Sequence, residues 1–455
     1  MVDEELLRDA AERAVAYLAG LPARPVVPSS AALAALDELR EPVPEGPTPA
    51  AEVLARLDRV GSPATVASAG PRYFGFVTGG SLPATTAASW LASAWDQNVA
   101  LSVMSPAGAL LEEVALGWCS ELLGLPATCS GAVTTGATMA NATALAAARH
   151  ALLARAGWDV ERDGLFGAPE ITVVVGDEVH VSVLKALSLL GFGHARVTRV
   201  PADAQGRMRA DALPELSGPA IVCLQAGNVN TGACDEAAPL IAWAHAADAW
   251  VHVDGAFGLW AAAAPAHAHL VRGIEQADSW VLDAHKWPNV PYDCGIALVR
   301  DAAAHRAALH LGASYLVDSG LREPSYLSPE FSRSARGVLL WASLASLGRS
   351  GLAELVERTC AHARRFADGL SEAGCEVLND VVLNQVLVRF GDAERTGRVI
   401  AGVQQEGTCW AGQTTWHGVT AMRISVSSWA TTAEDVERSL AAILRVAAAH
   451  PSGGA

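Results

Sequence analysis

Basic residues are scarce in this sequence. Lys and Arg total 32 in 455 residues, against 48 Asp and Glu, and the formal net charge at pH 7 is −16. A surface that binds nucleic acid needs clustered positive charge, and the sequence contains no basic cluster. Nucleic acid is therefore excluded as the expected partner.

Long apolar runs and targeting signals are also missing. His, Arg and Asp interrupt the alanine-rich stretches, so no run is long and charge-free enough to span a bilayer. The first twenty residues are acidic from Asp3 onward and predict an amphipathic helix rather than a signal peptide. We expect no membrane segment and a cytoplasmic location.

The eight cysteines are scattered, and none forms a CxxC pair. In a chain of this size, that pattern argues against a zinc ribbon or a disulfide scaffold. We expect reduced thiols that serve mostly as small core side chains.

The composition suits a packed enzyme, with 51% hydrophobic and 18% charged residues. The length allows a large α/β domain with a smaller partner. We expect three parts, without internal repeats: a proline-rich segment over 1–82 that wraps over something else, a large domain over 83–345, and a smaller α+β domain over 346–455.

Short β-branched runs alternate with helical patterns in the large domain. The runs lie at 171–175, 220–224, 250–253 and 295–299. This alternation is typical of βαβ units, so it predicts a mostly parallel sheet.

The stretch SWVLDAHKWPNVPYDCG, residues 279–295, places Lys286 after an apparent buried strand. A lysine at that point is costly unless it is paired, neutral or used covalently. The structural alternative is a lysine that extends its amine to the rim of the sheet.

Asp254 follows the apolar run 250–253, so it is expected at the carboxyl end of a strand, where open α/β sheets bind ligands. A carboxylate there can hold a protonated heterocyclic nitrogen, and Gly255 and Ala256 leave room for a flat ring. The alternative is an ordinary Asp-Gly turn.

The stretch TTGATMANATALAAAR, residues 134–149, predicts a Thr/Gly/Ala loop that leads directly into a helix. Backbone N–H groups and the helix dipole favour an anion there, and the hydroxyls of Thr135 and Thr138 can add donors. The loop is neither a Walker A motif nor GxGxxG. The alternative is a helix capped by Thr134 or Thr135.

Polar residues follow two further strands. His180 comes after the run at 171–175, where it could stack on a flat cofactor, although a lone histidine is more often structural. Asn228 and Asn230 follow the run at 220–224 and are expected to face the same crevice. An anion cradle, an imidazole, a carboxylate and an amine form the set that pyridoxal 5′-phosphate requires.

These residues also carry a resemblance to a known family. From PRYFGFV near residue 71 to MRISVSS near 423, the sequence resembles the pyridoxal-phosphate-dependent group II amino-acid decarboxylases, which include aromatic-L-amino-acid and glutamate decarboxylases. The motifs HVDGAF and DAHKW are similar to the HVDAA and HKW signatures of that family. The resemblance implies the aspartate-aminotransferase type of fold (fold type I), a homodimer, and decarboxylation of an L-amino acid to an amine and CO₂.

The resemblance also implies roles for individual residues. Lys286 would be the Schiff-base lysine, Asp254 would pair with the pyridine nitrogen, and His180 would stack on the ring. The other implied cofactor contacts are Ala256 beneath the ring, Gly136, Ala137 and Thr138 in the phosphate loop, and His285 beside the lysine.

Two further positions concern the reaction and the substrate. Tyr315, in GASYLVDSG, matches a tyrosine on the mobile loop of the family that protonates the substrate's Cα, which favours simple decarboxylation; Tyr326 is the next candidate. Where aromatic-specific members carry a Tyr-Phe-Pro-Thr stretch, this chain has Phe-Val-Thr-Gly at 76–79. Phe76 could still stack on an aromatic substrate. The substrate side chain stays open, as do the roles of Trp410 and Trp416.

Other functions stay in view. One is a different fold-type-I reaction, such as that of an aldolase, a β-eliminating lyase or an enzyme that forms a carbon–carbon bond with decarboxylation. A remote one is a metal-dependent hydrolase built on His180, His252, Asp254 and His285. It lacks an HExxH motif, and Lys286 would repel a cation there.

Overall fold

The computed structural model describes residues 3–312 and 320–451. The chain divides into two compact units, which are treated separately below. The smaller unit contains residues 1–78, 365–378 and 387–455, and the larger one contains residues 79–364 and 379–386. The expected domain boundaries near residues 82 and 345 remain a prediction.

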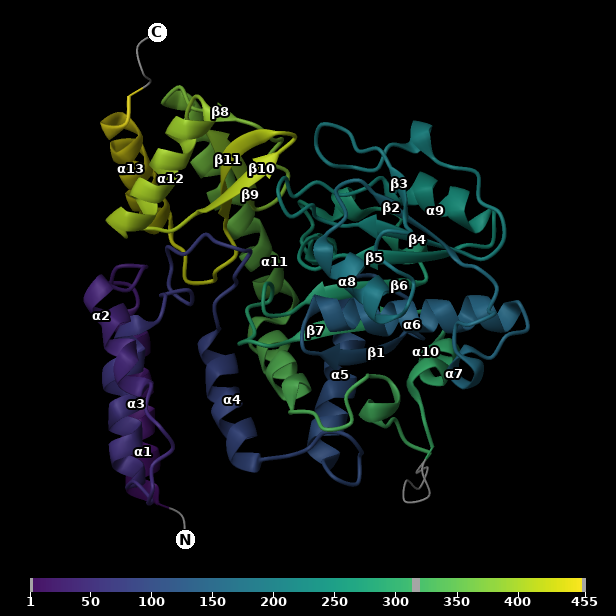
Figure 1. The fold of residues 1–455 in the computed structure, drawn as a ribbon, viewed down its shortest axis with the longest axis horizontal. Coiled ribbons are helices and arrows are strands. Elements are labelled where there is room, and N and C mark those ends of the chain that lie inside the picture. Colours follow the sequence, from purple (N-terminus) through teal and green to yellow (C-terminus); the bar gives the residue numbers. More distant parts are fainter. Residues whose placement is uncertain (1–2, 313–319, 452–455) are drawn as a thin grey trace. The chain divides into compact units, whose positions relative to one another are not determined.

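The larger unit is built on a seven-stranded sheet in the order β1-β7-β6-β5-β4-β2-β3 (Figure 1). Its strands are β1 Ser130–Thr134, β2 Thr172–Gly176, β3 Thr198–Val200, β4 Ala220–Gln225, β5 Trp250–Asp254, β6 Ser279–Asp283 and β7 Gly295–Val299. Only β7 runs antiparallel to its neighbours, β1 and β6. The predicted mostly parallel sheet is confirmed, and the four β-branched runs match β2, β4, β5 and β7 to within one residue at each end.

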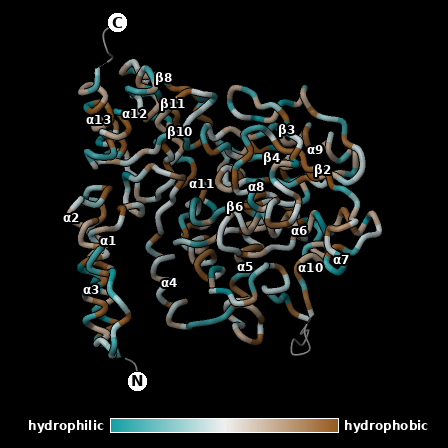
Figure 2. The backbone as a smooth tube through the Cα atoms, viewed as in Figure 1, coloured by the Kyte–Doolittle hydropathy of each residue, from teal (hydrophilic) through white to brown (hydrophobic). Residues whose placement is uncertain are grey.

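The larger unit also contains helices, several of which pack against this sheet. They are α4 Pro83–Trp95, α5 Pro106–Leu122, α6 Ala137–Arg155, α7 Val160–Asp163, α8 Val181–Leu189, α9 Ala237–His245, α10 Ala302–Leu309 and the first part of α11 Arg336–Glu372. Helix α6 lies against β1, β5, β6 and β7, with α8 and α10 beside it. The strands β2, β4 and β6 carry strongly hydrophobic residues, as Figure 2 shows. Burial of these faces on both sides forms the core.

The strand directions bring several strand ends to one edge of the sheet. Gly295, at the start of β7, pairs with Thr134 at the end of β1 and with Asp283 at the end of β6. Asp254 at the end of β5 pairs with Gln225 at the end of β4. This shared edge is where open α/β sheets place their ligands.

The smaller unit combines the N-terminal helices with C-terminal elements. Its helices are α1 Glu4–Gly20, α2 Ser30–Ala35, α3 Ala50–Ala64, the last part of α11 from Arg365, α12 Ala393–Glu406 and α13 Ala433–Ala449. Arg72 connects these parts: its buried guanidinium pairs with Asp435 at 2.9 Å and donates to the carbonyls of Pro22 and Thr408, each at 2.8 Å. The N-terminal helix and the closing helix predicted from the sequence are both present.

A second sheet has four strands in the order β10-β11-β9-β8. They are β8 Glu376–Val377, β9 Gln385–Arg389, β10 Gly412–Trp416 and β11 Val419–Ser425. Short 3-10 helices complete the chain at Leu36–Leu39, Ala210–Ala212, Gly258–Ala263, Ala268–Val271, Ile274–Gln276 and Pro324–Tyr326. No helix within residues 3–312 and 320–451 is long and apolar enough to cross a membrane.

Candidate active site

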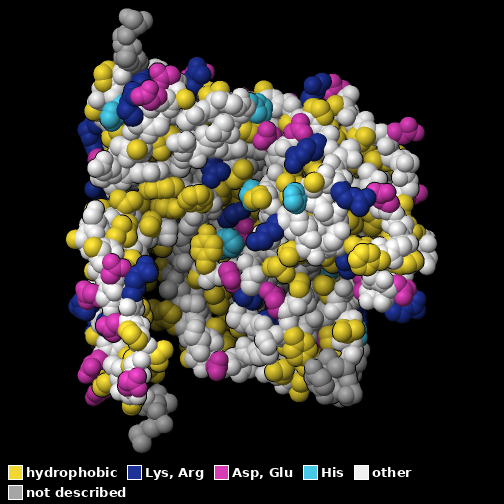
Figure 3. All heavy atoms as spheres, in the orientation of Figure 1, with side chains coloured by type: hydrophobic (Ala, Val, Ile, Leu, Met, Phe, Trp, Pro, Cys, Tyr) yellow, Lys and Arg dark blue, Asp and Glu magenta, His cyan; other side chains and the backbone are white. Residues whose placement is uncertain are grey.

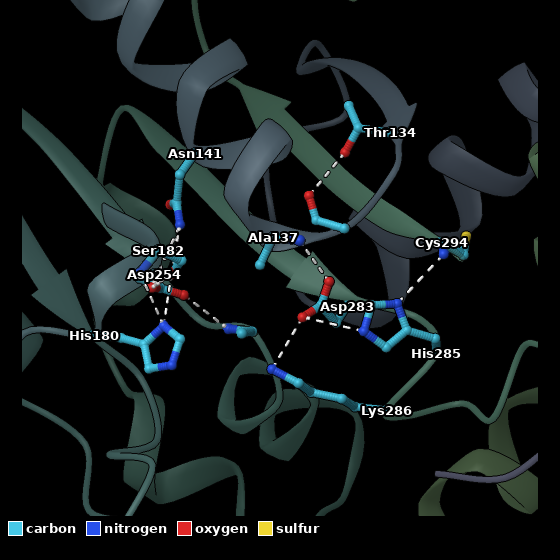
Figure 4. Close-up of polar contacts among 12 residues, drawn as sticks. Thr134, Ala137, Asn141, His180, Ser182, Asp254, Asp283, His285, Lys286 and Cys294 are labelled. Carbon is cyan, nitrogen blue, oxygen red and sulfur yellow. Dashed lines mark hydrogen bonds and ion pairs between the residues drawn. The ribbon is translucent and has the colours of Figure 1, made fainter. Parts of the chain in front are cut away.

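Lys286 lies just beyond β6, at the shared edge of the larger sheet (Figure 4). Its Nζ is 2.9 Å from Oδ2 of Asp283, and its side chain is only 16% exposed. The amine also lies 6.0 Å from the centroid of the Phe257 ring. The lysine is thus paired with a buried carboxylate instead of extending into solvent.

Asp283 connects the lysine to the rest of the edge. Its Oδ1 accepts a hydrogen bond from the backbone N–H of Ala137 at 2.7 Å, and its Oδ2 lies 3.5 Å from Nε2 of His285. The sequence interpretation did not single out this residue. The only signal for it was its place as the last residue of the strand before Lys286.

His285 is held as a neutral donor. The backbone N–H of Cys294 donates to its Nδ1 at 3.3 Å, so the ring proton lies on Nε2 and faces Asp283. Burial lowers the pKa of His285, and the nearby carboxylate of Asp283 only partly offsets that effect. The exposed ring of Tyr292 packs against the imidazole at a centroid distance of 4.4 Å.

The predicted loop that leads directly into a helix is present between β1 and α6, but its cap differs from the alternative suggested by the sequence. Helix α6 begins after Gly136, which has φ 120° and provides no side-chain cap. Thr134 belongs to β1, and its hydroxyl donates to the carbonyl of Gly136 at 3.2 Å. Thr135 is exposed and Thr138 half-buried. Neither Thr134 nor Thr135 is the N-cap, so that alternative was wrong.

Asp254 sits nearby at the end of β5 and is 5% exposed. The backbone N–H of Ala256 donates to its Oδ1 at 3.2 Å. Ser182 Oγ and Asn141 Nδ2 donate to its Oδ2 at 3.3 and 3.5 Å. Asp254 is therefore not simply a turn residue. The sequence interpretation missed Ser182 and Asn141 because each lies inside a helix, 72 and 113 positions from Asp254, and only the fold brings them to it.

His180 shares this hydrogen-bond network. It is the N-cap of α8, and its Nδ1 accepts the backbone N–H of Ser182 at 3.2 Å and lies 2.7 Å from Ser182 Oγ. Because Nδ1 accepts, the proton of the neutral form lies on Nε2. Ser182 Oγ has one proton, so at any moment it donates either to His180 Nδ1 or to Asp254 Oδ2. Ser182 thus connects His180 to Asp254.

Other predicted positions are not brought into this cluster. Asn228 is buried and holds its own loop: its Oδ1 accepts from the N–H groups of Asn230 and Thr231, and its Nδ2 donates to Gln225. Its role toward a cofactor remains a prediction. Phe76 belongs to the smaller unit, where its 65% exposed ring stacks on Trp410 at 5.4 Å. Its role toward a substrate also remains a prediction.

The two candidate proton donors are Tyr315 and Tyr326. Tyr315 lies outside the described residues. Tyr326 is buried, with its ring 4.2 Å from that of His310 and beneath the guanidinium of Arg306 at 4.6 Å. Tyr326 is thus packed as a structural residue.

The metal-hydrolase alternative gains no support from the geometry. Among the described residues, no group of three or more His, Cys, Asp or Glu is placed to hold a metal ion. Both ring nitrogens of His252 are already engaged, one by Ser279 and the other by Asn141.

Comparison with known proteins agrees with this geometry. Residues 34–390 match the model of the pyridoxal-dependent decarboxylase conserved domain. The chain is 32% identical over 388 residues to L-2,4-diaminobutyrate decarboxylase of Rhizobium meliloti, covering 79% of this chain and 74% of that protein. It is 27% identical to aromatic-L-amino-acid decarboxylase of Bacillus atrophaeus over 372 residues, covering 79% and 75%.

A solved structure shows the same fold. The crystal structure of Oryza sativa TDC with PLP and tryptamine superposes with a TM-score of 0.89 at 24% identity, over 98% of this chain and 97% of that one. The chain belongs to the group II family of pyridoxal-phosphate-dependent decarboxylases, and it is an amino-acid decarboxylase.

Proposed function

We propose that Lys286 holds pyridoxal 5′-phosphate at the shared sheet edge and that the enzyme converts an L-amino acid to the corresponding amine and CO₂. One observation carries this assignment: the amine of Lys286, the buried carboxylate of Asp254 and the N-terminus of α6 meet at one edge. When bound, the cofactor supplies an aldehyde that a lysine amine can capture and a ring that accepts electrons from a bond broken at the substrate's Cα.

The residues present fit this group. Gly295 lets the start of β7 pack directly against the phosphate loop, because a Cβ there would lie 2.4 Å from the backbone of Gly136. The N-cap Gly136 has no side chain to cover the start of α6, where Asp283 accepts the N–H of Ala137, and the dipole of the helix favours an anion there. The Oδ1 atom of Asp254 accepts the N–H of Ala256, and its second lone pair can accept the proton of a ring nitrogen.

Each side chain then has a defined task. Lys286 provides the amine, and Asp283 holds it beside the phosphate loop of Gly136, Ala137 and Thr138. Asp254 keeps a proton on the ring nitrogen and so favours electron withdrawal from the substrate. The remaining cofactor contacts are those that the family resemblance implies. His180 lies on one face of the ring and Ala256 on the other, and His285 and Asn228 lie at its periphery.

The proton that replaces CO₂ on the substrate's Cα is assigned to Tyr315. Gly312 and Gly320 flank the segment that carries it. A hydroxyl within hydrogen-bond reach of Cα delivers a proton, and a loop closed over the site excludes water. Protonation at Cα gives the amine. We also assign Phe76 to the substrate side chain, because its ring is exposed and stacked on Trp410.

The proposal includes a homodimer in the cytoplasm. In the larger unit, α4 exposes Trp90, Leu91 and Trp95. In the smaller unit, the N-terminal helices leave hydrophobic side chains among their charged ones, as Figure 3 shows. Apolar surfaces of this kind suit a contact with a second copy of the chain. All eight cysteines are unpaired thiols, which suits a reducing compartment.

The experiment that tests this function follows CO₂, amine, aldehyde and peroxide with a panel of L-amino acids. Wild-type enzyme should release CO₂ and amine in equal amounts from at least one of them. Tyr315→Phe should bind the cofactor normally, form amine at least about tenfold more slowly and divert some turnover to aldehyde with oxygen uptake. Turnover without CO₂ would instead favour an aldolase or an eliminating lyase. Equal amine yields from both forms would remove the assignment of Tyr315.

A further inference from the structure

A line of buried side chains leads from the core of the larger unit to Asp254. Trp250 Nε1 lies 2.9 Å from Ser279 Oγ, which lies 2.9 Å from His252 Nδ1. His252 Nε2 lies 2.7 Å from Asn141 Oδ1, and Asn141 Nδ2 lies 3.5 Å from Asp254 Oδ2. Strands β5 and β6 and helix α6 supply these residues. All four that precede Asp254 are at most 2% exposed.

The two ends of this line set the direction of its hydrogen bonds, because an indole N–H can only donate and a carboxylate can only accept. Ser279 Oγ accepts from Trp250, and Asn141 presents its NH₂ group to Asp254 and therefore its oxygen to His252. Nε2 of His252 then donates to Asn141 Oδ1, so Nδ1 carries no proton and accepts from Ser279 Oγ.

The same NH₂ group has a second acceptor. Asn141 Nδ2 lies 3.3 Å from Ser182 Oγ, the hydroxyl that also faces Asp254 and His180. A reversed Asn141 amide would bring its oxygen against the carboxylate and its NH₂ against a donor from His252. The network therefore permits only one orientation of Asn141.

We propose that Asn141, His252 and Ser279 are positioning residues that form a one-directional hydrogen-bond line and hold Asp254 as an acceptor toward the cofactor ring. The proposal rests on the function proposed above. It adds that Asp254 is oriented from the core side of the sheet, by residues that do not touch the cofactor. The NH₂ group of Asn141 donates to Oδ2 of Asp254. One lone pair of Oδ1 is then left to accept the proton of the ring nitrogen.

The environment of His252 supports a fixed donor. Burial lowers the pKa of His252 to about 4, although the charge of Asp254 acts in the opposite direction. At neutral pH the ring therefore has one proton and two distinct nitrogens. A ring with one proton accepts at one nitrogen and donates at the other, as a line with one direction requires.

The first test uses nitrogen-15 NMR of histidine-labelled protein free of cofactor. The signals of His252 are assigned by their loss in His252→Gln. The proposal expects the Nε2–H form, unchanged as the pH falls from 8 to about 5. An Nδ1–H form, or titration near pH 6.5, would overturn it. This result does not depend on whether the cofactor binds, so it separates failure of the line from failure of the proposed function.

The second test measures the affinity for pyridoxal 5′-phosphate and the pH dependence of its visible absorbance when bound. Asn141→Asp keeps the acceptor for His252 but replaces the donor toward Asp254 with an oxygen. His252→Leu removes the ring, whereas His252→Gln keeps a donor toward Asn141. We expect Asn141→Asp and His252→Leu to weaken binding roughly 10- to 100-fold, the effect of a lost hydrogen bond to a charged group, and to shift the absorbance profile. His252→Gln should restore much of the loss.

His305 provides the matched control. It is another fully buried histidine of the larger unit, bonded to a serine, Ser130, at 2.9 Å, with a pKa that burial lowers to about 4. His305→Leu should lower the thermal stability about as much as His252→Leu, yet leave the affinity within about twofold and the absorbance profile unchanged. Equal changes from both variants, or none from Asn141→Asp, would show that the line serves stability alone.

Discussion

Asp254 is the residue whose charge matters most for the proposed chemistry. Asp254→Asn keeps the shape of the side chain but does not hold a proton on the cofactor's ring nitrogen. We expect the chemical step to slow roughly 100-fold or more, as for the loss of one preorganised electrostatic contact, with a much smaller effect on substrate binding. Single-turnover kinetics separate these two effects.

The control for this variant is Asp278→Asn. Asp278 precedes β6, at the opposite end of that strand from Lys286, where it accepts the backbone N–H of Val251 at 2.8 Å. It should change stability and leave the chemical step alone. An Asp254→Asn enzyme with a normal chemical step would mean that the carboxylate serves only the local fold.

Among individual residues, the sequence predicts best those functional side chains that come soon after a strand. Lys286, Asp254 and His180 stand after apolar runs, and the structure brings Lys286 and Asp254 to one edge, with His180 linked to Asp254 through Ser182. Asp283 and Asn141 escaped prediction for a physical reason. Their partners are 146 and 113 positions away in the chain, and only the strand register and the placement of α6 bring them together.

The elements around the lysine approach one another closely. A Cβ on Gly79 would lie 1.9 Å from the backbone oxygen of Lys286, so the segment at 79 passes directly against the segment that carries the amine. The sequence interpretation assigned Gly79 only to a stretch on the substrate side. Its lack of a side chain is what permits this approach.

Gly79→Ala should therefore displace the backbone of Lys286. We expect a stability loss of roughly 1–3 kcal/mol, as for other overpacked sites, together with weaker cofactor binding. Gly117→Ala in α5 is the matched control, because nothing lies within 4 Å of a Cβ added there. Calorimetry and cofactor titration measure both effects. Identical behaviour of the two variants would contradict the close approach.

Sequence patterns predict strands and whole helices better than they predict the residue at which a helix begins. The run at 295–299 predicts β7 correctly, and the closing helix is found as α13. The start of α6 was less readable, because Thr134 looks like a helix cap. Thr134 pairs with Gly295 and so remains part of β1. Gly136 is the N-cap instead, and its positive φ of 120° favours glycine at that position.

At the scale of the whole molecule, the prediction concerns assembly. Helix α4 leaves Leu91 56% exposed, beside Trp90 and Trp95 at 42% and 43%. If a second copy covers this face, a charge placed there should block association. Sedimentation equilibrium should show a dimer for the wild type and a much weaker association for Leu91→Arg.

The control for assembly is Phe166→Ser. Phe166 is 98% exposed after α7, so its replacement removes an apolar surface residue elsewhere on the larger unit. This variant should remain dimeric. A wild-type chain that sediments as an active monomer would contradict the dimer.

The central claim is that Lys286 holds the cofactor, and the chain makes a direct test simple because it contains only two lysines, Lys185 and Lys286. Holoenzyme reduced with borohydride should lose its visible absorbance and, after digestion, yield the cofactor's mass on the peptide that contains Lys286 and none on the peptide that contains Lys185. Lys286→Ala should give no labelled peptide and lose turnover by orders of magnitude. A label on Lys185, or no label on an active enzyme, would contradict the account.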